Sequence, residues 1–379
     1  MEKFTIDVPE AVLADLRQRL LAARWPAPMP RPAWAYGTDP EFLRELVAYW
    51  ADGFDWPAVQ RRLNQQLPQF TADVQGQGLH FAHLRGQGPD PFPLVITHGW
   101  PSSFVEMERL ALLLAEPDDP ADAFDVVVPS LPGYGFSAAP PAGAALSART
   151  ASRWASLMVD VLGYQRFGAV GGDVGAGVTT RLGLNHADRV VGIHVDTDGV
   201  RAASPDTADL SPAERAYLVA DAQWTAEHGG YAHLQGTRPG TLAFGLADSP
   251  VGLAAYLIEK YRAWSDCGGD VLRRFSRDDL LTMVTLYWVT GTIGSSFLPY
   301  YDGRHAAAEA PPPARVEVPV AVALWREPDL PLPPRELAER SLNVTRWTPM
   351  PRGGHFAASE EPELLADDIR EFFRPLRRG

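Results

Sequence analysis

An aspartate flanked by glycines is the strongest chemical feature of the sequence. Asp173 follows a run of small and apolar residues at 167–172, and Gly171 and Gly175 lie two residues to either side of it. This spacing is typical of a nucleophile elbow, a sharp strand-to-helix turn that leaves no room for neighbouring Cβ atoms. The usual serine is replaced here by a carboxylate, which is ionised at neutral pH and attacks without a base. Attack at an sp³ carbon would give an alkyl-enzyme ester that water must then hydrolyse.

His355 is the best candidate for the base that activates this water. It lies in a Gly-Gly-His-Phe turn after the last expected strand, late in the chain, as in other elbow enzymes. The histidine needs a carboxylate to orient it and to stabilise its charged form. The loop after the expected strand 318–325 offers two carboxylates. The sequence favours Asp329 and leaves Glu327 as the alternative.

Two backbone N–H groups are expected to stabilise the oxyanion that forms during ester hydrolysis. Trp100, in the turn after the expected strand 93–97, would supply one of them. Val174, directly after the nucleophile, would supply the other. We interpret the neighbouring His98 as a structural residue that fixes the turn.

The leaving group is indicated by the hydrogen-bond donors near the nucleophile. A halide is often held by an indole beside the nucleophile, but that neighbour is Val174, whose side chain cannot donate a hydrogen bond. An epoxide oxygen needs an acid that is protonated at neutral pH, and tyrosine suits this because its pKa is about 10. The candidate tyrosines are Tyr231, Tyr300 and Tyr301, for each of which packing is the alternative role.

The composition and charge argue against several classes of protein. The 379 residues carry a formal net charge of −13, which argues against nucleic acid and anionic membranes as partners. The one cysteine, Cys267, excludes a disulfide within the chain and fits a reducing compartment. The N-terminus has no apolar signal core, and no apolar run is long enough to span a bilayer. We therefore expect a cytoplasmic protein.

Alternating strands and helices are expected to position the candidate residues. Apolar runs predict strands at 93–97, 124–128, 167–172 and 190–195, and helical periodicity predicts helices at 104–114, 150–162 and 178–185. This alternation predicts an α/β fold with a mostly parallel central sheet and helices on both faces.

The remaining segments predict an N-terminal arm and a helical cap. Before residue 90 we expect strands at 4–8, 70–74 and 79–84 and helices at 9–23, 41–50 and 56–67. Helices at 212–227, 253–262 and 278–290 form the cap, and a linker at 306–315 returns the chain to strands at 318–325 and 344–348 and a helix at 361–373. The expected division is 1–90 (arm and first strands), 91–200 (first part of the core), 201–312 (cap) and 313–379 (second part of the core).

Motifs along nearly the whole chain resemble those of the microsomal-type epoxide hydrolases, a family with the α/β-hydrolase fold. They are RWP at 24–26, HGWP at 98–101, LPGYGFS at 131–137, GGD at 171–173, DSPVGLA at 248–254 and RGGHFA at 352–357. The resemblance implies that Asp173 is the nucleophile and His355 the base. It also implies that Tyr231 and Tyr300 bind the epoxide oxygen, with Tyr301 a close rival of Tyr300.

The sequence departs from the family pattern in three places. Alignment backward from 337–340 puts the acid at Asp329, whereas alignment forward from 318–319 puts it at Pro328, which implies a one-residue insertion. Many members have an aromatic residue after the nucleophile, where this chain has Val174. The membrane-anchoring N-terminal helix of the animal enzymes is absent, which predicts a soluble enzyme.

Together these features predict a cofactor-independent epoxide hydrolase. It would convert a small hydrophobic epoxide and water into a vicinal diol. A haloalkane-type dehalogenase on the same scaffold is the alternative among enzymes, and a catalytically silent binding protein is the alternative outside them. The sequence leaves a homodimer open.

Overall fold

A mostly parallel sheet forms the centre of the molecule. The computed structural model describes residues 1–28, 30, 33–140, 146–202, 208–305 and 315–377. Within them the sheet runs in the order β1-β2-β3-β5-β4-β6-β7-β8-β9. The strands are β1 (Glu2–Phe4), β2 (Gln69–Val74), β3 (Gln77–Leu84), β4 (Phe92–Thr97), β5 (Phe124–Pro129), β6 (Phe167–Gly171), β7 (Val190–Val195), β8 (Val316–Leu324) and β9 (Leu342–Pro349). Strands β1, β2 and β3 pair antiparallel with one another, and so do β3 and β5. The remaining neighbours in the order β5-β4-β6-β7-β8-β9 pair in parallel, so the sheet is mostly parallel, as the sequence predicted.

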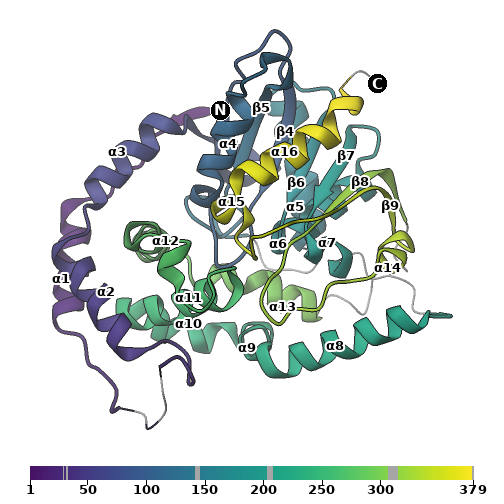
Figure 1. Cartoon of the computed structure of the whole chain (residues 1–379). Coiled ribbons are helices and arrows are strands. Elements are labelled where there is room, and N and C mark those ends of the chain that lie inside the picture. Colours follow the sequence, from purple (N-terminus) through teal and green to yellow (C-terminus); the bar gives the residue numbers. More distant parts are fainter. Residues whose placement is uncertain (29, 31–32, 141–145, 203–207, 306–314, 378–379) are drawn as a thin grey trace.

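Helices cover both faces of this sheet (Figure 1). Helices α4 (Glu108–Ala115) and α16 (Pro362–Phe373) pack together on one face, and α5 (Leu146–Ser156) and α6 (Val174–Asn185) pack together on the other. Every residue of β5, β6 and β7 is buried, which is the expected burial of parallel strands between two helical layers. Short elements complete the core: η2 (Pro120–Asp122), α7 (Thr197–Ala202), α14 (Arg335–Glu339), α15 (Ala357–Glu360) and η6 (Arg374–Leu376).

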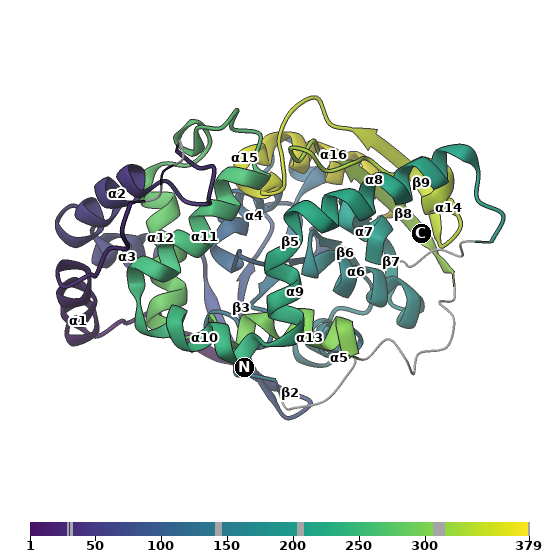
Figure 2. The ribbon, with the colours of Figure 1, turned by 90° about the horizontal axis from the view of Figure 1, so that it is seen from below.

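A helical cap lies at the edge where the parallel strands end (Figure 1). Its elements are α8 (Pro212–His228), α9 (Gly230–Thr237), α10 (Pro239–Asp248), α11 (Pro250–Trp264), η4 (Val271–Arg273), α12 (Arg277–Thr290), η5 (Ser295–Phe297) and α13 (Leu298–His305). Seen from below, these helices extend across the carboxyl ends of the strands (Figure 2). Of the helices described, none is by itself long and apolar enough to cross a membrane, although α10 with α11 and α12 with Ser295–His305 pass that test as bent pairs.

The N-terminal arm packs along the outer side of the cap. Its helices are α1 (Glu10–Leu21), α2 (Pro40–Asp52) and α3 (Trp56–Gln66), which contact α11 and α12 (Figure 1). The indole Nε1 of Trp50 donates to Thr285 Oγ1 at 2.9 Å in the buried part of this contact. The hydroxyl of Tyr49 donates to Asp278 Oδ1 at 2.7 Å at its exposed margin. The arm therefore holds the cap from outside.

The first strand ends earlier than the sequence predicted. β1 stops at Phe4, whereas apolar alternation predicted a strand over 4–8. The N–H group of Ile6 donates to Asn64 Oδ1 at 2.9 Å, and Asn64 Nδ2 donates back to the carbonyl oxygen of Ile6 at 2.9 Å. A side chain of α3 thus bonds the backbone groups that a neighbouring strand would have bonded.

Several helices also differ from the sequence prediction. The helix expected at 104–114 begins as a 3₁₀ turn, η1 (Phe104–Met107), and the one expected at 150–162 ends in a π-helical turn, η3 (Leu157–Val161). The sequence missed α9, α10 and α13, which are short and contain glycine, so tertiary packing rather than propensity stabilises them. The expected linker 306–315 lies almost wholly outside the described residues.

We expect Trp50→Phe to destabilise the protein by about 1–2 kcal/mol, because it leaves the fully buried Thr285 hydroxyl without its donor. Tyr49→Phe is the matched control, since it removes an exposed hydrogen bond between the same two helices and should cost under about 0.5 kcal/mol. Urea denaturation followed by circular dichroism measures both. Equal losses in the two variants would contradict a structural role for the buried bond.

Candidate active site

Asp173 lies in a strained turn between β6 and α6. Its backbone has φ +52° and ψ −125°, a conformation that non-glycine residues rarely adopt outside functional turns. A Cβ atom at Gly171 would lie 2.4 Å from the carbonyl oxygen of Gly175, and one at Gly175 would lie 2.1 Å from that of Thr97. The glycines are therefore required by close backbone approach, as the elbow pattern predicted. Helix α6 begins at once after Asp173, four residues before the helix start expected from the sequence.

The Asp173 carboxylate is desolvated and held by backbone donors. Its side chain is 18% exposed, and burial raises its pKa to about 6. The positive charge of His355 and hydrogen bonds from the N–H groups of Trp100 and Val174 act in the opposite direction and lower the pKa. The Trp100 N–H donates to Asp173 Oδ1 at 2.6 Å. Both N–H groups expected at an oxyanion site therefore lie at this carboxylate.

The turn that carries Trp100 is fixed by a buried histidine. The Nε2 of His98 accepts a hydrogen bond from the N–H of Leu131 at 3.1 Å, which links the loops after β4 and β5. Burial lowers the pKa of His98 to about 4, so its ring is neutral and can accept. This geometry supports the structural interpretation of His98.

His355 is paired with Glu327 rather than with Asp329. His355 Nδ1 lies 2.8 Å from Glu327 Oε2, and its Nε2 lies 3.8 Å from Asp173 Oδ2. Burial alone would lower the pKa of His355, but the negative charges of Glu327 and Asp173 outweigh it and hold that pKa well above 6.5. Asp329 is exposed and has φ +62°. The sequence preference for Asp329 was therefore wrong, and its alternative, Glu327, occupies the position.

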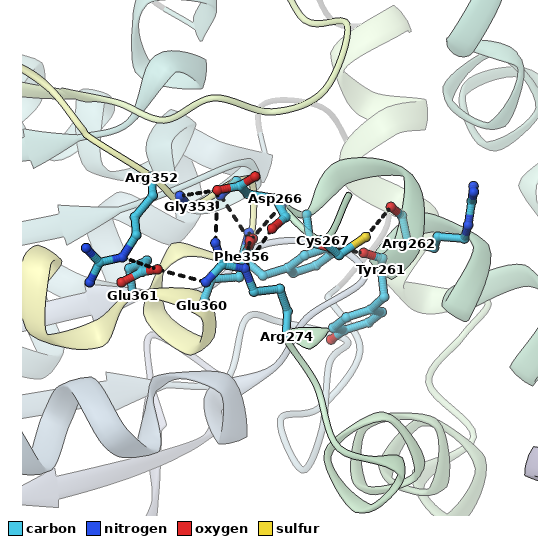
Figure 3. Close-up of polar contacts among 12 residues, drawn as sticks. Tyr261, Arg262, Asp266, Cys267, Arg274, Arg352, Gly353, Phe356, Glu360 and Glu361 are labelled. Carbon is cyan, nitrogen blue, oxygen red and sulfur yellow. Dashed lines mark hydrogen bonds and ion pairs between the residues drawn. The ribbon is translucent and has the colours of Figure 1, made fainter. Parts of the chain in front are cut away.

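The loop that carries His355 is clamped to the cap by a polar network (Figure 3). The N–H groups of Gly354 and Phe356 donate to Glu360 Oε2 and Oε1 at 3.1 and 3.0 Å, and the N–H of Gly353 donates to Asp266 Oδ2 at 3.0 Å. The N–H of Asp266, just after α11, donates to Glu360 Oε2 at 2.7 Å. Two carboxylates thus hold the backbone on both sides of the histidine.

Arginines pair with the carboxylates of this network. Arg274 Nη2 donates to Asp266 Oδ2 at 2.9 Å, and its Nη1 donates to Glu361 Oε1 at 2.8 Å (Figure 3). Arg352 Nε donates to the same Glu361 oxygen at 2.8 Å. Sequence reasoning missed this network. The signal available in the sequence was the pair of acidic residues Glu360 and Glu361 shortly after the candidate His355.

The cap brings two tyrosines over the elbow. The rings of Tyr231 and Tyr300 meet edge to face with centroids 5.8 Å apart, and Tyr231 stacks on Trp100 at 5.5 Å. Burial and the charge of Asp173 raise the pKa of both tyrosines well above 10, so both remain protonated. The buried Tyr300 hydroxyl has no hydrogen-bond partner in the described part of the chain. Tyr301 is instead 38% exposed and stacks on His305, so Tyr300 is the one that faces the site.

Asp196 is a further carboxylate at the elbow that sequence reasoning did not identify. Its Oδ2 accepts a hydrogen bond from the N–H of Asp173 at 3.2 Å, and its Oδ1 accepts one from the N–H of Asp198 at 3.0 Å. Burial and the charge of Asp198 raise the pKa of Asp196 well above its usual value. A carboxylate directly after the predicted strand 190–195 was the available signal, because parallel strands end at a common edge.

We expect Glu327→Gln to lower the pKa of His355, since it removes the negative charge that raises that pKa and leaves only a neutral amide oxygen as the hydrogen-bond acceptor. Asp329→Asn removes a carboxylate from the same loop and should leave it unchanged. Proton–nitrogen NMR titration of the His355 ring, with His355→Gln used to assign the signal, measures both. A larger shift in Asp329→Asn would restore the sequence preference.

Comparison with known proteins identifies the family. Residues 1–107 match the family described as Epoxide hydrolase N terminus, and residues 93–228 match that described as alpha/beta hydrolase fold. A relative from Stigmatella aurantiaca is 40% identical over 379 residues, which are 99% of this chain and 85% of that protein. Epoxide hydrolase 1 from Sus scrofa is 33% identical over 404 residues, covering 97% of this chain and 87% of its own.

Solved structures agree over the full length of the chain. Juvenile hormone epoxide hydrolase from the silkworm Bombyx mori has a TM-score of 0.85 at 28% identity and covers 100% of this chain and 94% of its own. The epoxide hydrolase of Aspergillus niger has a TM-score of 0.84 at 29% identity, covering 99% and 96%. These matches confirm the predicted fold class, and the chain belongs to the epoxide hydrolase family of the α/β-hydrolase fold.

Proposed function

We propose that this epoxide hydrolase opens its substrate through a covalent ester on Asp173, which a water activated by His355 then hydrolyses. The observation that carries the proposal is the pair of protonated tyrosines, Tyr231 and Tyr300, beside a buried carboxylate nucleophile. Ring opening needs an anion on one side of a carbon and a proton donor for the oxygen that leaves it. The site supplies both.

The first step attaches the substrate to the enzyme. Tyr231 and Tyr300 donate hydrogen bonds to the epoxide oxygen, while Asp173 Oδ2 attacks a ring carbon. The carbon–oxygen bond of the ring breaks, a tyrosine gives its proton to the departing oxygen, and a 2-hydroxyalkyl ester forms. The resulting tyrosinate takes up the proton that His355 releases once the ester has formed. Asp173 Oδ1, which accepts the Trp100 N–H, becomes the ester carbonyl oxygen. The pKa of about 6 for Asp173 keeps most of the nucleophile ionised above that pH.

Ester formation changes the charge that His355 experiences. The Asp173 carboxylate raises the pKa of His355, and Oδ2 lies 3.8 Å from Nε2. Esterification removes this negative charge, so the pKa of His355 falls at the moment when a neutral base is needed. Glu327 continues to orient the ring through Nδ1. The same histidine therefore stabilises the ionised nucleophile first and accepts a proton afterwards.

The second step releases the product. His355 Nε2 takes a proton from water, and the resulting hydroxide adds to the ester carbonyl carbon of Asp173. The N–H groups of Trp100 and Val174 stabilise the oxyanion. Collapse of this intermediate breaks the acyl–oxygen bond, and the departing alkoxide takes the proton of the regenerated Asp173 carboxyl group to complete the diol. Asp173 becomes a carboxylate again and retains one oxygen from water.

Aromatic walls favour a hydrophobic epoxide as substrate. Trp264 packs against Tyr231 with centroids 5.0 Å apart and against Trp100 at 6.0 Å. Such rings bind apolar groups and exclude water. A dehalogenase is less well supported, because Val174 offers no side-chain donor for a halide.

We expect a single turnover of styrene oxide in H₂¹⁸O to place the label in Asp173 rather than in the diol, because water attacks the acyl carbon. Peptide mass spectrometry locates the label. Label that enters the diol directly would exclude the ester route. Asp173→Ala should lose turnover by about 10⁴-fold or more, and chloride release from a haloalkane would favour the dehalogenase instead.

We expect Tyr231→Phe and Tyr300→Phe each to slow ester formation by about 10- to 1000-fold, because each removes a donor to the leaving oxygen. Tyr301→Phe is the matched control and should change the rate by less than about twofold, since its ring is exposed. Stopped-flow tryptophan fluorescence measures the rate. A larger loss in Tyr301→Phe than in Tyr300→Phe would reverse the assignment.

A further inference from the structure

A cavity lies behind Asp173 and His355, within the core. It leaves about 60 Å³ for molecules the size of water and reaches from the carboxyl ends of β4, β6 and β7 to helices α4 and α16. Its walls include Asp173, His355, Trp100 and Glu106. The tyrosines Tyr231 and Tyr300 do not appear among the described residues of its wall. The cavity therefore approaches the nucleophile from the side away from the epoxide-binding hydroxyls.

Glu106 brings an unpaired polar atom to this cavity. The residue belongs to η1 and is 9% exposed, and its Oε2 has no hydrogen-bond partner among the residues that the structure describes. Burial raises its pKa to about 7, while a hydrogen bond from Ser102 and the positive charge of His355 lower it. A buried oxygen of this kind costs free energy unless water or a ligand binds it. The polar wall beside His355 makes water the chemically suitable occupant.

A second cavity leads from Glu106 toward the surface. It leaves about 420 Å³ for molecules the size of water and lies between α3 of the arm, α4 and cap helix α12. Arg62 and Arg109 line it and have side chains that are 43% and 66% exposed. Among the described residues, Glu106 is the one that lines both cavities. It thus lies at the junction of a solvent-accessible space and the catalytic centre.

We propose that Glu106 binds the water that hydrolyses the Asp173 ester, and that this water enters from the cavity between the arm and the cap. The inference rests on the proposed function, because it needs an ester to hydrolyse. Glu106 Oε2 accepts one water proton as a hydrogen bond, while His355 Nε2 removes the other proton. The hydroxide then adds to the ester carbon, and the acyl–oxygen bond breaks to release the diol. Glu106 itself is a positioning residue and forms no covalent bond.

The occupancy of the substrate side supports this route. In the ester the alkyl group lies on the cap side, where Tyr231 and Tyr300 hold its oxygen, so that side is filled when water is needed. Entry from behind Asp173 avoids this obstruction. Water that follows the substrate path would instead have to pass the bound alkyl group.

The test separates formation of the ester from its hydrolysis. Glu106→Met replaces the carboxylate by an apolar side chain of similar length, Glu106→Gln keeps an acceptor, and Glu106→Asp withdraws the carboxylate by one methylene. Glu108→Gln is the matched control, because Glu108 is a buried carboxylate of the adjoining helix that lines only the second cavity and pairs with Arg62. Stopped-flow fluorescence with styrene oxide gives both rates, and intact-protein mass spectrometry shows whether the adduct accumulates.

We expect Glu106→Met to form the ester within about twofold of the wild-type rate but to hydrolyse it at least about tenfold more slowly, so that the adduct accumulates. Glu106→Gln should retain more hydrolysis than Glu106→Met, and Glu108→Gln should change neither step. Glu106→Asp should also slow hydrolysis selectively, which keeps the test decisive if Glu106→Met does not fold.

Two results would overturn the inference. Wild-type hydrolysis rates in the folded Glu106 variants would show that this residue does not position the water, and an equal loss of both rates would indicate a merely structural role. Absence of any adduct in wild type and in His355→Gln would instead contradict the ester mechanism itself. The failure of the inference and the failure of the proposed function are thus distinguishable.

Discussion

Burial of the Asp173 carboxylate is the constraint on which the site depends. Desolvation raises the pKa of this group to about 6, and further desolvation without compensation would leave the nucleophile protonated at neutral pH. The N–H of Trp100 and the charge of His355 provide the compensation. These groups follow β4 and β9, whereas Asp173 follows β6, so only the assembled sheet brings them together. The fold therefore determines the ionisation state of the nucleophile as well as its position.

The cap does more than cover the substrate. Its residue Asp266 and the core residue Glu360 together bond the backbone around His355, and Arg274 pairs with Asp266. The main chain of His355 also donates to the carbonyl oxygen of Trp264 in α11, at 3.0 Å. Since the arm packs against α11 and α12 from outside, a displacement of the cap would move the base as well as the tyrosines. In the proposed mechanism, substrate binding by the tyrosines and water activation by His355 would therefore depend on the same placement of the cap.

The sequence predicted the features that local backbone rules control. Asp173 was found because glycine spacing reports a turn that excludes Cβ atoms, and β7 was placed at 190–195 because buried parallel strands are continuously apolar. The choice of Glu327 over Asp329 depends instead on how an irregular loop folds, and Asp329 has φ +62°. Tyr300 and Tyr301 are neighbours on α13, so their side chains point in directions about 100° apart around the helix axis. The sequence did not predict this helix and could not distinguish the two directions.

The order of the two proposed steps would account for polar groups on both sides of one aspartate. In the proposed ring opening, Asp173 attacks toward the cap, where Tyr231 and Tyr300 hold the oxygen. In the proposed hydrolysis, its own carbonyl carbon is attacked while the alkyl group occupies the cap side. This mechanism needs a second approach from the core, and we propose that the cavity beside His355, which Glu106 lines, provides it. Because the Trp100 N–H binds Oδ1 in both proposed steps, the carboxyl group need not rotate between them. The epoxide then approaches Asp173 from the cap side, and water approaches it from the core side.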